Sequence, residues 1–279
     1  MELNGGMRLG LSIKEFDIFP KKEACESLNV GIVDGSVVVW RLRGIKSDLI
    51  ERLRRSAPAT CKALEYAIEN VEVGMNEVEL ARKAGQIMMK EGPFWYNTQG
   101  YYPPFGACVA FDIEIPKGYI CFDFGAEYGH YITNMHRVVL LGEKPTEEER
   151  HLCNVRAEAN EIIQRAVKPR RRFDEVIEEL KAFVEESGCV LAEKYIGHGI
   201  GLDIHEPPSI GLSAKPRFYS GCGMPGYPTK FEVGRVFTLE LNIQDPKLPF
   251  SFNCEDDVVV TPTGCELLAK FPREIVIKP

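Results

Sequence analysis

Apolar residues recur at helical spacing in two stretches of the first half of the chain. In residues 46–71 the pattern predicts a helix that Pro58 is expected to kink or restart. After Gly74, residues 77–90 (EVELARKAGQIMMK) show the same spacing and predict a second helix. The chain therefore begins its main body with a pair of helices.

The residues that follow change to patterns typical of loops and strands. Residues 92–106 are rich in aromatic residues, Pro and Gly, and we expect a loop there. Runs of β-branched and aromatic residues then predict three strands over residues 107–113, 119–124 and 130–141, the last two forming a hairpin around Gly129. Nearer the N-terminus, residues 30–42 predict two strands about a turn at Asp34-Gly35.

The second half repeats this order. Pro145-Thr146 opens a predicted helix to about Val167, and three glutamates occupy its first turn, where the helix dipole favours acidic side chains. A second helix is predicted over residues 173–187, ending before Gly188. Strands then follow near residues 235–243, 255–262 and 266–269. Because two helices followed by antiparallel strands occur twice, we predict a duplicated α+β core.

Composition narrows the class of protein. The chain has 279 residues, of which 44% are hydrophobic, so it can bury a large core and is not intrinsically disordered. Its net charge of −7 argues against a nucleic-acid partner. No apolar stretch approaches the roughly 18 residues of a membrane span, and the N-terminus does not resemble a signal peptide. We therefore expect a soluble, cytoplasmic protein without a membrane partner.

The cysteines indicate a reducing environment. There are nine, and no two are spaced as CxxC. A structural zinc site or a redox dithiol is therefore not expected, and the thiols should be reduced and mostly buried.

Acidic residues and histidines occur where burial makes them costly. Asp123 lies in ICFDFG, Glu240 in VFTLELNI and Glu255 in NCEDDVVVT. His198 and His205 lie seven residues apart in YIGHGIGLDIHEPP, where glycines permit close approach. A carboxylate on a buried strand needs an ion pair or a bound cation. The set suits Mn, Fe, Co or Zn, with ordinary ion pairs as the alternative.

Five ordered strings resemble the catalytic domain of the pita-bread metallohydrolases, namely LRGIKSDLIERLRRSA, FDFGAEYGHYITNMHRVVLLG, GHGIGLDIHEPP, FTLELNI and EDDVVVTPTGCELLAKFPRE. This superfamily includes Xaa-Pro dipeptidase, aminopeptidase P, methionine aminopeptidase and creatinase, and the resemblance is nearest the Xaa-Pro dipeptidase branch. It implies a pita-bread catalytic domain over residues 41–279, with residues 1–40 as a reduced N-terminal stub. It also implies a small-molecule or short-peptide substrate and a homodimer.

The resemblance further implies a two-metal site with five side-chain ligands. Asp123 matches an aspartate on one metal, and His198 and Glu240 match the residues that hold the other. Glu255 matches a glutamate that bridges both metals. Glu240 would also act as the general base, and His205 matches a histidine that contacts the substrate carbonyl and stabilises the oxyanion.

One ligand of this set is changed. The family pattern Y-I-S-D-I-T-R reads YITNMHR here, so that the second, bridging aspartate is Asn134. Two divalent ions carry a charge of +4, whereas Asp123, Glu240 and Glu255 supply only −3. The amide is also a poor bridge, because its nitrogen is a donor that repels a cation. We therefore expect one ion rather than two, with metal-free, creatinase-like chemistry as an alternative.

A second departure lies upstream of Asp123. The dipeptidase branch usually has a substrate-binding histidine there, but residues 92–118 contain none. Aromatic residues stand in its place, and they predict either ordinary loop packing or a rebuilt substrate pocket for an apolar or cationic group. The candidate pocket residues are Trp95, Tyr101, Tyr102 and Phe105, together with His136.

His136 is the third departure, since the family has threonine at this position. Residues two apart on a strand share a face, so His136 should point the same way as Asn134. It is expected to be either a replacement ligand or base, or a histidine bonded to a neighbouring carboxylate.

Together these features predict a hydrolase of the Xaa-Pro dipeptidase or aminopeptidase type that cleaves a small amide or peptide C–N bond at an altered metal centre. The alternative from another class is a catalytically inactive pita-bread domain that binds a peptide or protein.

Overall fold

The computed structural model describes residues 8–11, 31–34, 50–92, 94–101, 112–192, 195–211 and 229–278. Within them, the first half contains the helices and strands α3 (Ile50–Asn70), α4 (Glu77–Lys90), β3 (Phe94–Tyr101), β4 (Gly118–Tyr128), β5 (Tyr131–Ile132) and β6 (Met135–Leu141). The second half contains α5 (Glu147–Ala166), α6 (Phe173–Glu186), β7 (Val190–Leu191), β8 (Tyr195–Gly199), β9 (Glu206–Gly211), β10 (Val236–Gln244), β11 (Ser251–Val260), β12 (Cys265–Leu267) and β13 (Val276–Lys278). The predicted duplicated α+β order is confirmed.

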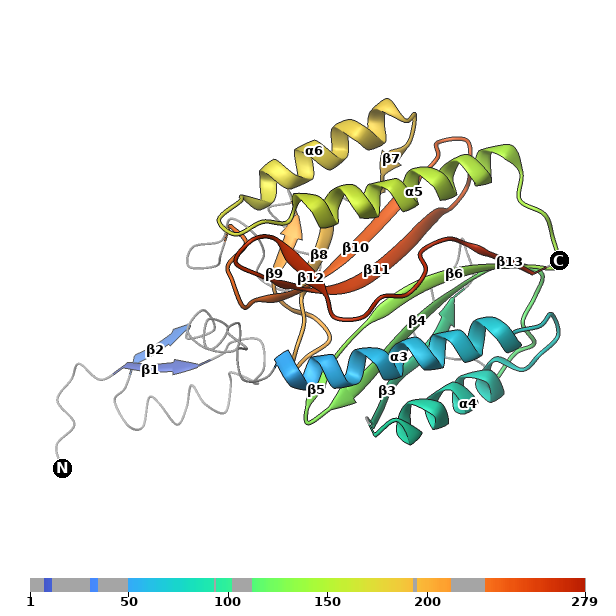
Figure 1. The fold of residues 1–279 in the computed structure, drawn as a ribbon, viewed down its shortest axis with the longest axis horizontal. Coiled ribbons are helices and arrows are strands. Elements are labelled where there is room, and N and C mark those ends of the chain that lie inside the picture. Colours follow the sequence, from blue (N-terminus) through green and yellow to red (C-terminus); the bar gives the residue numbers. More distant parts are fainter. Residues whose placement is uncertain are drawn as a thin grey trace.

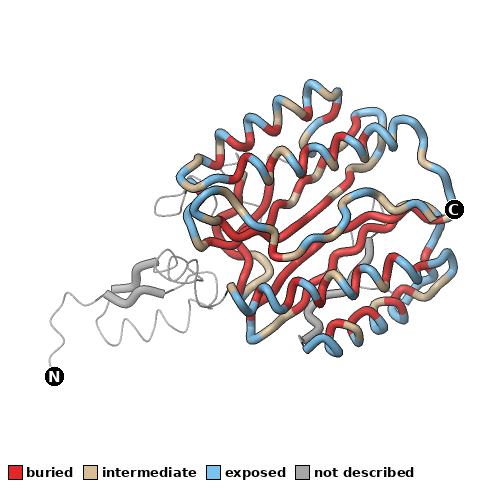
Figure 2. Tube along the Cα trace, viewed as in Figure 1, coloured by how far each residue is buried: buried red, intermediate tan, exposed pale blue. Residues whose placement is uncertain are grey.

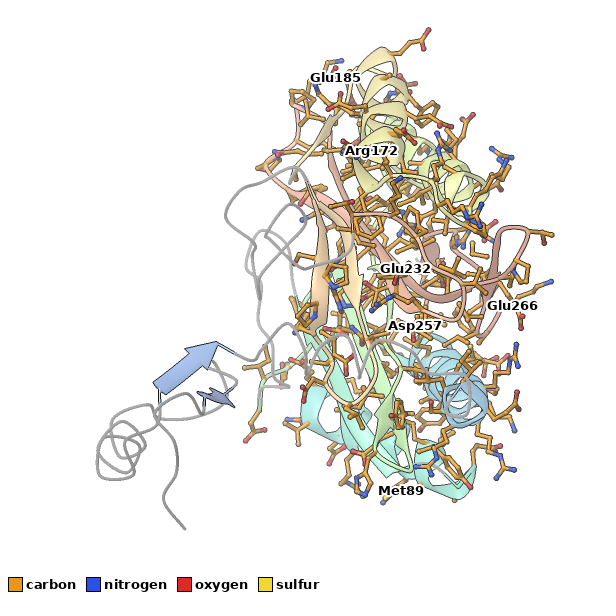
Figure 3. All side chains as sticks on the ribbon, turned by 90° about the vertical axis from the view of Figure 1, so that its left-hand side faces the viewer. Met89, Arg172, Glu185, Glu232, Asp257 and Glu266 are labelled. Atoms are coloured by element: carbon orange, nitrogen blue, oxygen red, sulfur yellow. The ribbon has the colours of Figure 1, made fainter. Side chains whose placement is uncertain are left out.

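One curved sheet joins the two halves. Its main path runs β3-β4-β6-β11-β10-β8-β9, so that β6 of the first half pairs with β11 of the second. Figures 1 and 3 show the helices against one face of this sheet, with α3 and α4 over the first half and α5 and α6 over the second. These four helices therefore do not cover the other face of the sheet.

Local sequence explains where the helices begin. The side chain of Asn76 accepts a hydrogen bond from the backbone N–H of Glu79 and caps α4. Thr146 and Glu149 form a reciprocal capping box at the start of α5. The helix α3 continues through Pro58, so the expected restart there is wrong.

Each half has its own apolar core between helices and sheet. Figure 2 shows that the central strands are buried along most of their length, whereas each helix buries one side. In the second half Phe173 of α6 packs edge-on against Phe231 and Phe237, with ring centroids 4.7 and 5.9 Å away. The helices of the second half are thereby packed against one face of the sheet.

The loop predicted over residues 92–106 is wrong for the part that the structure describes. Residues Phe94–Tyr101 form β3, which pairs antiparallel with β4. The residues Phe94, Trp95 and Thr98 favour strands, but the register shifts between Trp95 and Asn97 and interrupts the two-residue period. This interruption explains why the pattern did not indicate a strand.

Other predictions fall partly outside the described residues. Gly31–Asp34 is a strand, β2, and it pairs in parallel with β1 (Arg8–Leu11), while the second strand predicted within residues 30–42 lies outside them. The same holds for most of the strand predicted over residues 107–113. The division into residues 1–40 and 41–279 stays a prediction. None of the helices in the described ranges is both long and apolar enough to span a bilayer.

Candidate metal centre

Four ionisable residues form a row across four neighbouring strands. In the antiparallel registers Asp123 of β4 lies opposite His136 of β6, His136 lies opposite Glu255 of β11, and Glu255 lies opposite Glu240 of β10. Directly opposed residues share one face of a sheet, with their strands about 4.8 Å apart. The strand pairing itself therefore gathers three acids and a histidine.

His136 lies in the middle of this row and is buried. Its Nε2 atom is 2.9 Å from Oδ1 of Asp123 and 2.8 Å from Oε2 of Glu255. Its Nδ1 atom is 2.9 Å from Nδ2 of Asn253. His136 therefore lies within hydrogen-bond distance of two carboxylates, and its role as a replacement ligand or base stays a prediction.

Asn134 also faces the row, as its two-residue spacing from His136 predicts. Its Nδ2 donates a 2.9 Å hydrogen bond to Oε2 of Glu255, and its backbone N–H donates to Oδ2 of Asp257 at 2.8 Å. The nitrogen end of the amide thus points toward the glutamate that matches the bridging ligand. This orientation is the one that opposes a cation on that side.

A second group lies on the other side of Glu255. Nε2 of His198 is 3.4 Å from Oε1 of Glu255 and 3.9 Å from Oε2 of Glu240. Nδ1 of His198 lies 2.8 Å from the carbonyl oxygen of Gly199, which can only accept. The proton of a neutral His198 is therefore on Nδ1, and the lone pair of Nε2 is directed toward the two glutamates, as in histidine metal ligands.

Gly197 permits this placement of His198. Its φ is +144°, and a Cβ at this position would lie 1.9 Å from the carbonyl oxygen of Thr238 on β10. Thr238 in turn accepts a hydrogen bond from the backbone N–H of His198 at its side-chain oxygen, at 3.2 Å. The glycine of the GHGIG string thus lets β8 approach β10 closely.

His205 lies beside this second group. Its ring centroid is 4.5 Å from that of His198, and the residue is partly exposed. Burial and the neighbouring His198 lower the pKa of the His205 imidazole to about 4. At neutral pH this imidazole is uncharged, and it can donate one hydrogen bond to an acceptor in the site.

The pKa values of Glu255 and Glu240 are shifted in opposite directions. Burial alone would raise the pKa of Glu255, but His136 and His198 lower it further than burial raises it. The pKa of Glu240 is raised, first by burial and then by the charge of Glu255. Glu255 is therefore ionised, whereas Glu240 binds a proton more readily than an ordinary glutamate.

The donor set of the second group fits a divalent metal ion. Two ligands on one ion can be no farther apart than two bond lengths, about 4.2 Å for Zn-type ions, and the His198 contacts satisfy this limit. The ligand atoms of His198, Glu240 and Glu255 all lie within 4.8 Å of one another, as do those of Asp123, His136 and Glu255. Among the described residues, none donates a hydrogen bond to the buried Oε1 of Glu255. That oxygen is directed toward His198 and suits a cation.

Sequence reasoning missed two residues of the site. Asn253 donates through Nδ2 to Oε1 of Glu240 at 2.9 Å as well as contacting His136, and Asp257 fixes the backbone of Asn134. Both are two residues from Glu255 on β11 and therefore share its face. The two-residue spacing used for His136 would have found them.

The predicted aromatic pocket is not described at the level of side chains. Trp95 and Tyr101 belong to β3, whose backbone lies at the edge beside Asp123, since Gln99 pairs with Asp123. Tyr102 and Phe105 lie outside the described residues. Their role in binding a substrate stays a prediction.

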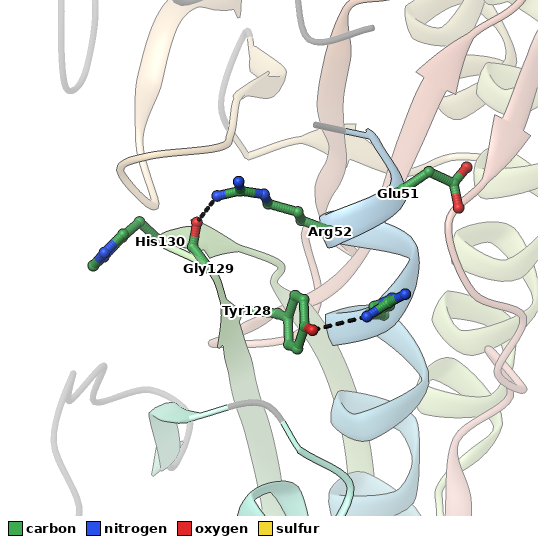
Figure 4. A pocket seen from close by; sticks show the side chains of 6 residues that line it. Glu51, Arg52, Tyr128, Gly129 and His130 are labelled. Atoms are coloured by element: carbon green, nitrogen blue, oxygen red, sulfur yellow. Dashed lines mark hydrogen bonds between the residues drawn. The ribbon is translucent and has the colours of Figure 1, made fainter. Parts of the chain in front are cut away.

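A separate surface hollow lies at the start of α3. It is lined by Glu51, Arg52, Arg55, Tyr128, Gly129 and His130, and Figure 4 shows Arg52 bonded to the carbonyl of Gly129. It shares no residue with the row of acids and histidines. The chemistry is therefore assigned to the row rather than to this hollow.

Comparison with known proteins identifies the family of the chain. The model of metallopeptidase family M24 matches residues 51–262. The Xaa-Pro dipeptidase of Pyrococcus furiosus is 30% identical over 249 residues, which cover 86% of this chain and 67% of that protein. The chain thus spans about two thirds of the length of this relative.

Solved structures show the same fold. The prolidase from Pyrococcus furiosus superposes with a TM-score of 0.79 at 28% identity, covering 96% of this chain and 77% of that one. The X-Pro aminopeptidase from Thermotoga maritima gives a TM-score of 0.79 at 24% identity, covering 97% and 74% of the two chains, and supports the pita-bread fold alone. The chain belongs to metallopeptidase family M24 and is similar to its Xaa-Pro dipeptidases.

Proposed function

We propose that the protein is a hydrolase that cleaves short peptides of the Xaa-Pro type at a centre holding one divalent ion. The observation that carries this proposal is the group of His198, Glu240 and Glu255, of which His198 and Glu255 are buried, with His205 beside it. The names of the similar proteins, Xaa-Pro dipeptidase and prolidase, support the choice of substrate.

His198, Glu240 and Glu255 would hold the ion. Imidazole and carboxylate ligands suit Mn, Co, Fe or Zn. When bound, such an ion supplies Lewis-acid polarisation of the scissile carbonyl and makes water more acidic. Asp123, on the far side of His136, is left outside this ligand set.

Glu240 is the proposed general base. Its Oε1 is fixed by Asn253 at 2.9 Å, and its Oε2 faces His198. One carboxylate oxygen is therefore held by Asn253, while the other faces His198 and the space in which the ion and its water would be bound. A glutamate in this position can accept the proton of the attacking water and deliver it to the leaving amine.

His205 is proposed to bind the carbonyl oxygen of the substrate. Its partial exposure lets it reach a bound peptide, and its uncharged imidazole offers a single N–H. Donation to the oxygen that becomes negative stabilises the tetrahedral state more than the ground state.

Hydrolysis of Ala-Pro and Gly-Pro by Mn²⁺-loaded protein, followed as released proline, tests the proposal. Glu240→Gln should lower kcat by about 10²–10⁴-fold, the usual contribution of a general base. His205→Asn should lower kcat by about 10²–10³-fold, as for loss of an oxyanion donor. Glu266→Gln, a change at a half-exposed side chain on β12, is the matched control and should leave kcat unchanged.

If protein that holds one ion releases no proline from these dipeptides or from Xaa-Pro tripeptides, the proposed Xaa-Pro hydrolase function is rejected. The inactive peptide-binding domain would then be the better assignment, and it would tolerate Glu240→Gln. The predicted homodimer can be tested separately by light scattering of the eluted protein.

A further inference from the structure

We propose that the imidazole of His136 takes the place of a second divalent ion, and that its N–H links Asp123 to Glu255 where an ion would otherwise bridge them. The centre is thereby restricted to one ion on the His198 side. This inference rests on the metal-dependent function proposed above and supplies a physical reason for a single ion.

The first support is the position of Nε2. It lies between two buried carboxylates, 2.9 Å from Asp123 and 2.8 Å from Glu255. These are the lengths of charge-assisted N–H···O hydrogen bonds. The side chain belongs to the residue that the strand pairing places directly between the two acids. An ion bridging the same carboxylates would have to occupy the space that this ring occupies.

The second support is the partner of the other ring nitrogen. Nδ2 of Asn253 lies 2.9 Å from Nδ1 of His136, and the same amide nitrogen donates to Glu240. An amide NH₂ has two hydrogens and can donate to both. The other ring nitrogen is thus held by Asn253, so that Nε2 faces Asp123 and Glu255 and carries the N–H that links them.

The third support is Asn134. Its Nδ2 donates to the same Oε2 of Glu255 that His136 contacts, and it lies 3.5 Å from Nε2 of His136. Two N–H groups thus converge on this oxygen, and a cation placed there would face both. The opposite oxygen, Oε1, accepts no hydrogen bond from a described residue and faces His198. Glu255 consequently offers one oxygen to hydrogen bonds and the other to an ion.

The fourth support is the charge of the site. Asp123, Glu240 and Glu255 together carry a charge of −3. This is one charge too few to neutralise two divalent ions, and one more than is needed to neutralise a single divalent ion. The departure at residue 134 removes a negative charge, and the departure at residue 136, on the same face, adds N–H donors for the carboxylates that remain. The two changes therefore compensate for each other on one side of the centre.

Metal counting on four proteins tests the proposal. Wild type, Asn134→Asp, His136→Thr and the double variant are loaded with Mn²⁺, desalted, and analysed by elemental mass spectrometry. We expect one ion per chain in the wild type and in each single variant, and two in the double variant, where the carboxylate is restored and the ring is gone. His151→Thr is the matched control, because it makes the same substitution at an exposed histidine on α5.

Each other result overturns the proposal in a recognisable way. Two ions in Asn134→Asp would show that charge at residue 134 alone sets the count. Two ions in the wild type and one in His136→Thr would make His136 a ligand. One ion or none in the double variant would show that His136 is not what keeps a second ion out of the site.

A measurement on the wild type alone guards against variants that do not fold. Its Mn²⁺ EPR spectrum at saturation should be that of isolated ions, and an exchange-coupled pair would contradict the proposal. The ion count does not depend on hydrolysis. If the counts are as expected but no Xaa-Pro peptide is cleaved, the proposed function fails and this inference stands.

Discussion

Asp256→Asn is expected to cost the protein about 3–5 kcal/mol of its unfolding free energy. Asp256 is 1% exposed, and its carboxylate accepts from Nη2 of Arg137 at 2.5 Å and from Nε of Arg273 at 2.6 Å. Arg137 is equally buried, so that removal of the negative charge leaves a buried guanidinium without its counter-ion. Losing one member of a buried ion pair typically costs this amount.

Arg137 also has a structural task that increases the effect. Its Nη1 donates to the backbone carbonyls of His136 and Glu255, at 2.7 and 2.8 Å, across the junction of β6 and β11. A guanidinium displaced by loss of Asp256 would leave both carbonyls buried without this donor. The pKa of Arg137, which burial lowers, is raised overall by Asp256, so the group stays charged in the folded protein.

The assay is urea unfolding of the metal-free protein, followed by circular dichroism and extrapolated to water. Glu266→Gln breaks the ion pair with Arg54, whose side chains are 40% and 50% exposed, and should cost less than about 1 kcal/mol. If Asp256→Asn lowers the unfolding free energy no more than Glu266→Gln does, the reasoning is refuted. Such a result would mean that burial does not make the Arg137–Asp256 ion pair costly to break.

Three further predictions follow from the backbone and the thiols. Gly197→Ala should destabilise the protein severely, because the new Cβ would lie 1.9 Å from the backbone oxygen of Thr238. Gly188→Ala should cost only about 1 kcal/mol of unfolding free energy, because Gly188 has a φ of +76° but open space around it. Equal urea midpoints for the two variants would contradict this difference. Burial raises the pKa of Cys61 to about 12 and that of Cys153 to about 11, so both thiols should react with DTNB at pH 8 at least about tenfold more slowly in folded than in urea-unfolded protein. For the same reason stability should fall as pH rises above about 9, where the unfolded thiols lose protons that the folded ones keep, and a urea midpoint unchanged from pH 8 to pH 10 would argue against the raised pKa values.

The sequence allowed the order of elements to be predicted because the two halves use strong local signals. Helical spacing, the Thr146 cap and the Gly129 hairpin each act within a few residues. The strand β3 was missed because its pairing with β4 and its bulge depend on partner residues 20 to 33 positions away in the sequence.

The residues of the site were predictable as a set but not as a geometry. Motif resemblance identified Asp123, His198, Glu240 and Glu255, yet no local pattern states that His136 lies opposite both Asp123 and Glu255. That follows from the register of three strands drawn from both halves. The contacts of Asn253 were missed for the same reason, although its spacing from Glu255 was available.

The junction of β6 and β11 has a consequence for how the two halves stay together. His136, Asn134 and Arg137 of the first half each bond to Glu255 of the second, through side-chain or backbone atoms. These bonds join the two halves directly. His198, Glu240 and Glu255, which would hold the proposed ion, all come from the second half. The halves are thus fastened to each other by hydrogen bonds of the polypeptide, and removal of the proposed ion with a chelator is expected to leave the contacts between them intact.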